Sequence, residues 1–309
     1  MTDYIFLEDD FKEGFDFSYE PWLFHDPKHL KIQFSEWKYF SINNVRRRTV
    51  EAQLNVVVYN SDAISPFRAP FGSIQFAKDL KPSILFEFVQ FVCEKLKEKG
   101  VARIILKNPP DAYLDYSPIL NTILFNLGFH VELAEVGAVL SMENDFVLHL
   151  SRTKKRKFRQ LDKSQLTFKT FALSELENVF KFIQRCRVER RYSLSIDWDT
   201  LSRTVSTFGD RFFLFGILDR TEIAAATISI NVGNKILYNF QPAHLKKYDG
   251  SSPMLMLLSG MHQFCRENGY DLLDLGTSSL EGFPNFKLLD FKLGLGAHPT
   301  MKLTYHKRL

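Results

Sequence analysis

The order of helices and strands is repeated along this chain, and that repeat limits the possible folds more than any other feature. Ser83 and Ser252 each open a long predicted helix, and Gly100 and Gly269 end those helices; both pairs lie 169 residues apart. A glycine just past a helix permits the left-handed backbone that closes it. A short apolar strand and a second helix follow each time, which predicts two copies of one α/β unit. Unrelated segments that coincide by chance are the alternative.

Other elements with ordinary signals surround the two copies. Six further segments have the apolar character and length of strands: 48–60, 129–134, 146–150, 211–218, 222–230 and 235–241. Ser174 and Glu177 have capping-box spacing and start a helix expected to reach Arg191. Another helix is expected over 200–208. Three of the strands follow one another closely, with hairpin turns, and form a meander before the second copy.

Chain length favours two domains. A length of 309 residues exceeds one typical core and fits two domains of about 150 residues each. We expect a boundary after residue 150, which gives domains 1–150 and 151–309. The fold class that follows is α/β, with a mixed sheet of α+β character.

Composition restricts the location of the protein. The first 20 residues carry seven acidic side chains and one lysine, unlike the basic start of a signal peptide. No apolar run is long enough to span a bilayer. The three cysteines, Cys93, Cys186 and Cys265, lie far apart and form no CxxC motif, so reduced thiols are expected. These observations predict a cytoplasmic protein without a membrane span.

The turn that precedes the second long helix is a candidate anion site. It consists of residues 246–252, Lys-Lys-Tyr-Asp-Gly-Ser-Ser. Unpaired backbone amides and the positive end of the helix dipole suit a phosphate at such a place. Lys246 and Lys247 supply positive charge, and Gly250, Ser251 and Ser252 supply the amides. The alternative is an ordinary serine N-cap followed by proline.

A basic segment lies near the middle of the chain. Residues 151–191 contain thirteen Lys or Arg and four Asp or Glu, and 152–159 alone contains six cations. Such a segment attracts phosphates of a tRNA, a coenzyme A or a lipid headgroup. A solvated connector between domains is the alternative interpretation.

These features together resemble the GNAT superfamily of acyltransferases. The likeness rests on the strand with Leu237-Tyr238, the helix from Ser252-Pro253, the strand end Asp274–Ser278, and Phe291-Lys292 before a glycine turn. The tandem copies narrow it to the FemAB-like branch, with a first domain that is degenerate. Members transfer an acyl or aminoacyl group from acyl-CoA or aminoacyl-tRNA to an amine. The usual Arg/Gln-x-x-Gly-x-Gly/Ala turn is reduced here to its central Gly250, so both donors stay open.

The resemblance also implies where the site lies. In GNAT proteins the strand with Tyr238 and Asn239 splays from the next strand, and the donor lies in the gap. Tyr238 and Asp274 are then the candidates for handling the amine proton, and Lys292 is a candidate ligand for the donor. Asn239, Thr277 and Ser278 are candidates for binding the acceptor, since ligands bind at the carboxyl ends of strands. Each has a structural alternative: sheet packing, capping, loop chemistry or a solvated lysine.

The sequence therefore predicts an N-acyltransferase or aminoacyltransferase that acts by direct attack of a primary amine on the donor. The acceptor is expected to be a small molecule or a peptide, with acyl-CoA as a possible co-substrate and tRNA as a possible partner of 152–191. No serine-hydrolase, P-loop, dinucleotide-binding or HExxH zinc motif occurs, and no metal is expected. The alternative is a GNAT-like scaffold without catalysis that binds RNA, tRNA or a partner protein.

Overall fold

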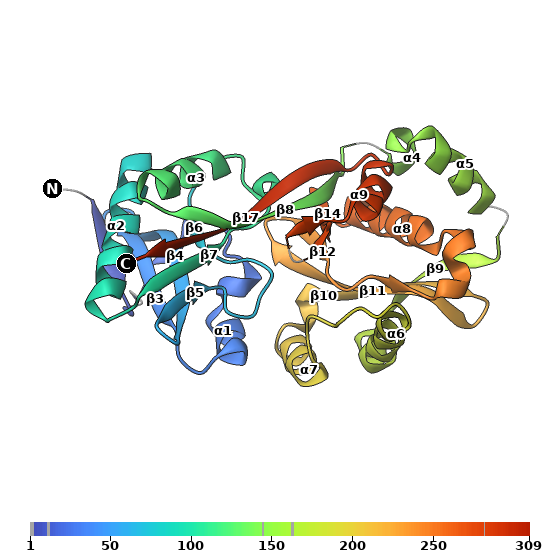
Figure 1. The fold of residues 1–309 in the computed structure, drawn as a ribbon, viewed down its shortest axis with the longest axis horizontal. Coiled ribbons are helices and arrows are strands. Elements are labelled where there is room, and N and C mark those ends of the chain that lie inside the picture. Colours follow the sequence, from blue (N-terminus) through green and yellow to red (C-terminus); the bar gives the residue numbers. More distant parts are fainter. Residues whose placement is uncertain (1–2, 11–12, 144, 162–163, 281) are drawn as a thin grey trace. The chain divides into compact units, whose positions relative to one another are not determined.

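The computed structural model describes residues 3–10, 13–143, 145–161, 164–280 and 282–309. The chain forms two compact units: Met1–Glu135 with Met301–Leu309, and Val136–Thr300. The predicted α/β class and the two copies of the helix–strand–helix unit are confirmed, with the first copy in the first unit and the second in the other (Figure 1). Among the described residues, no helix is long and apolar enough to cross a membrane.

The first unit is a sheet with helices packed on it. Its strands run in the order β1 (Tyr4–Glu8), β3 (Lys38–Asn44), β4 (Thr49–Tyr59), β5 (Asp62–Ser65), β7 (Arg103–Lys107) and β17 (His298–Arg308). The short strands β2 (Asp16–Phe17) and β6 (Ile74–Phe76) also pair with β4. The helices are α1 (Pro27–Gln33), α2 (Pro82–Glu98) and α3 (Ser117–Asn126), with single turns η1 (Leu23–His25) and η2 (Asp111–Tyr113).

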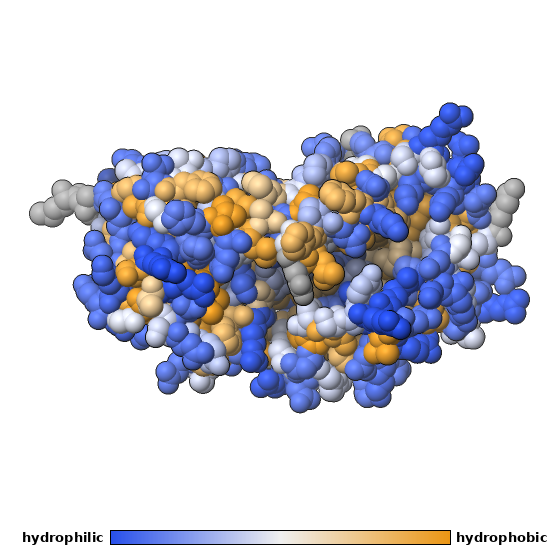
Figure 2. Space-filling view, in the orientation of Figure 1, coloured by the Kyte–Doolittle hydropathy of each residue, from blue (hydrophilic) through white to orange (hydrophobic). Residues whose placement is uncertain are grey.

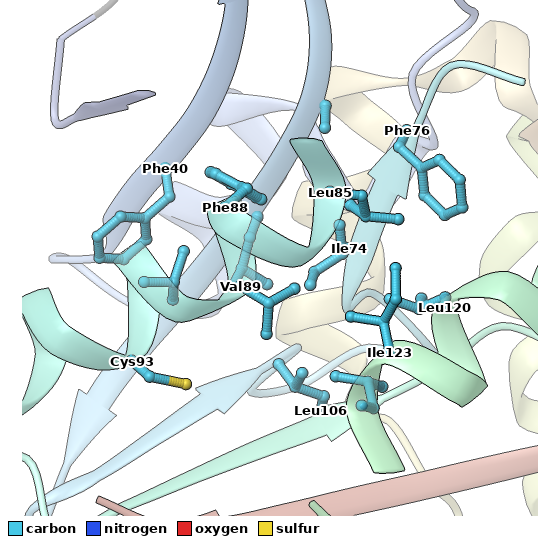
Figure 3. Close-up of a cluster of buried hydrophobic side chains, with 14 of the residues drawn as sticks. Phe40, Ile74, Phe76, Leu85, Phe88, Val89, Cys93, Leu106, Leu120 and Ile123 are labelled. Carbon is cyan, nitrogen blue, oxygen red and sulfur yellow. The ribbon is translucent and has the colours of Figure 1, made fainter. Parts of the chain in front are cut away.

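Apolar periodicity explains the core of this unit. Leu85, Phe88 and Val89 lie on one stripe of α2 and are at most 2% exposed. Figure 3 shows these side chains meeting Phe40 of the sheet and Leu120 of α3 in one apolar cluster. Burial of side chains of this size contributes about 1.5–3 kcal/mol each, so packing rather than helix propensity holds α2 in place.

The second unit is a mixed sheet with helices on both faces. Its strands run in the order β8 (His130–Ser141), β14 (Leu272–Thr277), β12 (Ile236–Asn239), β11 (Glu222–Gly233), β10 (Phe212–Asp219) and β9 (Leu166–Phe171). The short strand β13 (Ala243–His244) pairs with β11, and β15 (Ser279–Leu280) forms a hairpin with β16 (Phe283–Pro284). The helices are α4 (Phe146–His149), α5 (Arg152–Leu161), α6 (Leu176–Glu189), α7 (Trp198–Thr207), α8 (Pro253–Glu267) and α9 (Phe286–Leu293), with the turns η3 (Leu173–Glu175), η4 (Gly209–Arg211) and η5 (Lys246–Ser251).

Helix α8 connects β12 to β14, which run parallel, whereas the other pairs of this sheet's main path are antiparallel. In Figure 1, α8 covers one face of β10 and β11, and α6 covers the other. Gly260 lets α8 approach β9 closely, because a Cβ atom there would lie 2.2 Å from the Phe168 ring. The parallel pair places the carboxyl ends of β12 and β14 at one sheet edge.

Two local expectations are wrong. Residues 146–150 contain the helix α4 rather than a strand: Phe146 and Leu150 are buried whereas Leu148 is 66% exposed, a helical period that a short apolar run does not reveal. Ser174 and Glu177 form no capping box, because the turn η3 precedes α6. The Glu175 carboxylate instead accepts a hydrogen bond from the Ala172 amide at 3.1 Å.

The last strand of each copy has residues in both units. β8 begins in the first unit and pairs with β14 from Gly137 to Ser141, and β17 pairs with β7 from Thr304 to Arg308. The compact units therefore divide the chain at Glu135 and Met301, whereas the expected boundary lies at residue 150. The two boundaries differ because β8 and β17 pair with strands that are far away in the sequence, and a single cut at one residue cannot follow such pairing.

Candidate active site

The parallel strands β12 and β14 separate where the candidate site lies. Their paired register ends at Tyr238 and Asp274, although β14 continues to Thr277. Beyond β12, the amides of Phe240 and Gln241 both donate to the Ile228 carbonyl on β11, at 3.1 Å each. The chain thus turns toward β11 and leaves the edge of β14 beyond Asp274 without β12 as its neighbour. Two parallel strands that part in this way leave backbone groups able to bind an extended ligand.

A buried lysine holds the end of β14. Lys292 is 4% exposed, and its Nζ donates to the carbonyl of Gly276 at 2.6 Å and to that of Thr277 at 2.9 Å. Burial lowers its pKa from 10.5 to about 8, while the nearby Asp274 acts in the opposite direction. The expectation of a solvated lysine is wrong, because the polar end of this side chain reaches two strand-end carbonyls. An ammonium with a lowered pKa in such a place is typical of functional sites.

The backbone of β14 bends at Gly276. Its φ is +75°, and its amide donates to the Asp274 carboxylate at 2.7 Å. A Cβ atom on Gly276 would lie 3.6 Å from the Tyr238 ring, so the tyrosine lies directly against this bend. Tyr238, Asp274 and Lys292 therefore meet around one glycine. Sequence reasoning missed Gly276, although Asp-x-Gly is a known signal for a carboxylate that caps a turn amide.

The three predicted acceptor residues lie in different surroundings. The Thr277 carbonyl accepts a hydrogen bond from Lys292 Nζ. Ser278 is fully buried; its amide donates to the Val136 carbonyl at 2.6 Å, and its Oγ has no hydrogen-bond partner among the described residues. The Asn239 side chain accepts a hydrogen bond from the Thr227 hydroxyl on β11 at 2.6 Å. Thr277 therefore belongs to the group around Gly276 that contains Lys292, which we call the Lys292 cluster. The Asn239 side chain is instead hydrogen-bonded to the neighbouring strand.

The candidate anion turn is a single 3₁₀ helix, η5, rather than an open loop. Ser252 has left-handed backbone angles (φ 53°, ψ 44°), and its side chain forms no capping hydrogen bond to α8. Ser252 thus occupies the N-cap position before Pro253, as the alternative expected, but its side chain does not cap α8. Gly250 has open space where a Cβ atom would stand. The amides of this segment precede the positive end of the α8 dipole, as an anion site requires.

Carboxylates surround this turn. Lys247 Nζ forms an ion pair with Glu222 at 2.6 Å, which lowers the pKa of that carboxyl through the hydrogen bond from the ammonium. The Tyr248 hydroxyl donates to Asp219, and Glu189 accepts a hydrogen bond from the Lys246 amide at 3.2 Å. The charge of Lys247 is thus already paired with Glu222, and amides within η5 take part in the 3₁₀ helix, as the Tyr248 amide does by donating to the Leu245 carbonyl.

A further polar cluster braces the turn from α6. The Asp249 carboxylate accepts hydrogen bonds from Arg190 and from His244, the latter at 2.8 Å. Burial lowers the pKa of His244, and the hydrogen bond to Asp249 opposes that effect. Arg190 belongs to the basic segment that the sequence suggested for phosphates, but here it fixes the turn. No simple signal in the sequence indicates this contact, because its partners are 59 residues apart.

The comparisons with known proteins agree with this architecture. Residues 150–288 match the family model of the GNAT acetyltransferase domain. The chain is similar in fold to FemX, with 14% identity, a TM-score of 0.70 and coverage of 94% of both chains. It is also similar to L-PGS from Bacillus licheniformis, with 13% identity, a TM-score of 0.58 and coverage of 90% of this chain and 85% of the other.

A third similar structure is a tandem GNAT protein from the clavulanic acid biosynthesis pathway, with 10% identity, a TM-score of 0.51 and coverage of 88% of this chain and 83% of the other. No curated protein matches the sequence. The second part of the chain, residues 150–288, thus matches a GNAT acetyltransferase domain, and FemX and a tandem GNAT protein are among the chain's structural relatives. The predicted family and the predicted class of enzyme, an N-acyl or aminoacyl transferase, are thereby confirmed.

Proposed function

We propose that this protein transfers an acyl or aminoacyl group directly to a primary amine at the carboxyl ends of β12 and β14. The observation that carries the proposal is the buried Lys292 ammonium at the end of β14, beside Tyr238 and Asp274. The amine nitrogen attacks the donor carbonyl carbon, a C–N bond forms, and the bond to the thiolate or alkoxide leaving group breaks. No covalent enzyme intermediate is needed, since binding and orientation supply much of the rate.

Each side chain has a role in this scheme. Lys292 orders the end of β14 and stabilises the negative charge that develops on the donor carbonyl oxygen. Asp274 accepts the proton that the attacking amine loses, and Tyr238 donates a proton to the leaving group. Thr277 lines the acceptor side, whereas Ser278 and Asn239, whose side chains are buried, stay predictions for acceptor binding. The acceptor is a small molecule or a peptide that carries a primary amine.

Acyl-CoA is the donor that the turn before α8 supports best. Lys246 and the amides of Gly250, Ser251 and Ser252 would hold its phosphates, while Lys247 is already paired with Glu222. A donor carried by tRNA is the second candidate, and the basic segment 152–191 is what favours it. A cytoplasmic location and a degenerate first domain stay predictions, as do the limits 1–150 and 151–309 for the two GNAT-type domains.

A thermal-shift panel tests the choice of donor. It contains acetyl-CoA, longer acyl-CoAs, free CoA and an aminoacyl-tRNA mimic, each far above its expected dissociation constant. A ligand at 100 times its Kd stabilises the folded state by about 2.7 kcal/mol, so a true donor raises the melting temperature. Stabilisation by acyl-CoA and by free CoA supports a CoA site. If no donor changes the melting temperature, a scaffold without catalysis, which binds RNA or a protein partner, is the better interpretation.

A further inference from the structure

A cavity of about 100 Å³ lies in the second unit, and four of the residues that line it have titratable side chains: Glu143, His149, His262 and His298. Each comes from a different place in the chain. Glu143 follows β8, His149 ends α4, His262 lies on α8, and His298 begins β17. None of them has a role in the proposed reaction or in the turn before α8. We call this space the histidine cavity.

The histidine cavity borders the start of β14, whereas the Lys292 cluster lies at the end of that strand. Ser141, which lines the cavity, pairs with Leu272, the first residue of β14. Lys292 instead binds the carbonyls of Gly276 and Thr277. An occupant of the cavity would therefore be separate from the groups that meet at the Lys292 cluster.

One wall of the histidine cavity is apolar and closely packed. Leu140, Phe146 and Leu295 line it and are at most 4% exposed. The turn after α9 lies directly against the end of α4, because a Cβ atom on Gly296 would stand 2.2 Å from the His149 Cβ atom. In Figure 2, apolar surface lies over α9, the helix that leads into this wall. Such a wall suits a short hydrocarbon group.

The charge in the histidine cavity is negative. Glu143 is acidic, and no lysine or arginine is among the described residues that line the cavity. Within the described ranges, the Glu143 carboxylate forms no ion pair and accepts no hydrogen bond. The nearby Arg266 is paired with Asp145 at 3.5 Å, so its charge is already balanced. An unpaired carboxylate beside an apolar wall favours a cation with a hydrocarbon part.

The His262 imidazole adds a hydrogen-bond acceptor. It is 3% exposed, and its Nε2 lies 3.3 Å from the Ser141 carbonyl oxygen. Because a carbonyl can only accept, Nε2 carries the proton, and the neutral ring keeps a lone pair on Nδ1. Burial lowers the pKa of His262, which keeps the ring neutral at pH 7, although the hydrogen bond to Ser141 opposes that effect. Neutral imidazoles and a carboxylate together accept hydrogen bonds from a group with several N–H donors.

The spacing of these side chains favours an organic cation over a metal ion. Among the described residues, no group of three or more His, Cys, Asp or Glu side chains is placed to hold a metal ion. The three imidazoles and the carboxylate line one cavity nevertheless. Acceptors that are too widely spaced to ligate one ion can still surround a larger ligand. A protonated primary amine has three N–H donors that point in different directions, as the lysine ammonium does.

We infer that the histidine cavity binds a small primary amine in its protonated form. The ammonium group donates hydrogen bonds to the Glu143 carboxylate, to His262, and to His149 or His298, while the hydrocarbon part lies on the apolar wall. This inference does not depend on the proposed transfer reaction, because it concerns binding at another place in the second unit. It gives this unit an amine site in addition to the place where the proposed acceptor would bind.

Titration of the full chain with propylamine at constant pH, followed by the imidazole resonances in NMR spectra, tests the inference. Propylamine should bind with a Kd on the order of 1 mM. It should shift the resonances of His149, His262 and His298 together, while the resonance of His130 in the first unit stays in place. Propanol has the same length without the charge and should bind at least about tenfold more weakly. Equal binding of propanol, or no shift at the three histidines, would overturn the inference.

A pair of variants tests the carboxylate. Glu143→Gln keeps the size of the side chain but removes its charge, and it should weaken the binding of propylamine by at least about tenfold. Glu267→Gln removes the same charge from an exposed position at the end of α8, outside the histidine cavity, and should bind propylamine like the native chain. Urea unfolding checks that both variants fold. Native affinity in Glu143→Gln contradicts the inference, and so does an equal loss in both variants, which would indicate a response to the general surface charge.

Discussion

The Lys292 ammonium donates a hydrogen bond to the Gly276 carbonyl at 2.6 Å, across the end of β14. The lysine is buried, and the glycine has a φ of +75° with its amide bound to Asp274. A buried charged group, which is costly to place in a protein interior, and a glycine that permits a left-handed bend thus occur together at one strand end. Their coincidence marks this strand end as the centre of the candidate site.

Removal of the Lys292 charge should reduce transfer far more than it reduces stability. Lys292→Met keeps the apolar stem but removes the donor to a developing oxyanion, and loss of such a donor costs roughly 10²–10³ in kcat. The two carbonyls left without their partner should cost about 1–3 kcal/mol in the free energy of unfolding. Turnover assays and urea unfolding measure these effects. Lys287→Met, on the exposed side of the same helix, should change neither; equal turnover in both variants would exclude a role for Lys292.

Stability and activity should both depend on pH through Lys292. Its folded pKa is about 8 and its unfolded pKa about 10.5, so between these values the unfolded chain holds a proton that the folded chain has lost. The free energy of unfolding should therefore rise with pH across this window, by at most about 3 kcal/mol. Below pH 8 both states are protonated, so the free energy of unfolding stops changing with pH through this group while the full cost of burying the ammonium remains. Unfolding of the native protein and of Lys292→Met, compared at pH 7 to 10.5, isolates this difference.

The rate of transfer should fall with pH over the range in which the free energy of unfolding rises. If the ammonium form stabilises the oxyanion, kcat should fall as pH rises through about 8. A kcat that rises through this range and then stays high would instead indicate that the neutral amine acts as a base. A pH profile at saturating donor distinguishes the two roles.

Alanine at Gly276 should disturb the site through backbone strain at the bend that holds Asp274 and Lys292. A left-handed residue with a Cβ atom costs about 1–2 kcal/mol, and the new methyl group would stand 3.6 Å from the Tyr238 ring. We expect a loss of stability of that size together with a large loss of transfer. Gly269→Ala is the matched control, since Gly269 has a φ of +72° and open space around its Cβ position. Similar turnover in the two variants, at similar stability, would contradict the assigned position of the site.

A bulky residue at Gly250 should weaken donor binding without loss of stability. Gly250 lacks a positive φ and has open space around its Cβ position, so Gly250→Val should change the free energy of unfolding by no more than about 0.5 kcal/mol. A side chain there would block the approach of a phosphate to the turn amides. The thermal shift produced by acyl-CoA should shrink in this variant. An unchanged shift would mean that the donor phosphates bind elsewhere.

Much of the fold could be predicted because its signals are local. The strands around Thr49–Tyr59 and Phe212–Asp219 follow from apolar and β-branched runs, and the helices that end before Gly100 and Gly269 follow from their apolar stripes and closing glycines. The helix α4 was missed because four apolar residues do not distinguish a helix from a strand. The boundary between the compact units differs from residue 150 because β8 and β17 pair with strands far away in the sequence.

The sequence by itself determined the repeated α/β order, the GNAT class and the residue types at the end of β14, because periodicity, glycine stops and turn residues act within a few positions. Only the tertiary structure decided that Lys292 is buried against Gly276, that Lys247 is paired with Glu222, and that Arg190 is bound to Asp249. Those properties depend on which distant segments pack together. Burial and ion pairing arise from that packing, and they set the charge that each side chain can offer to a ligand.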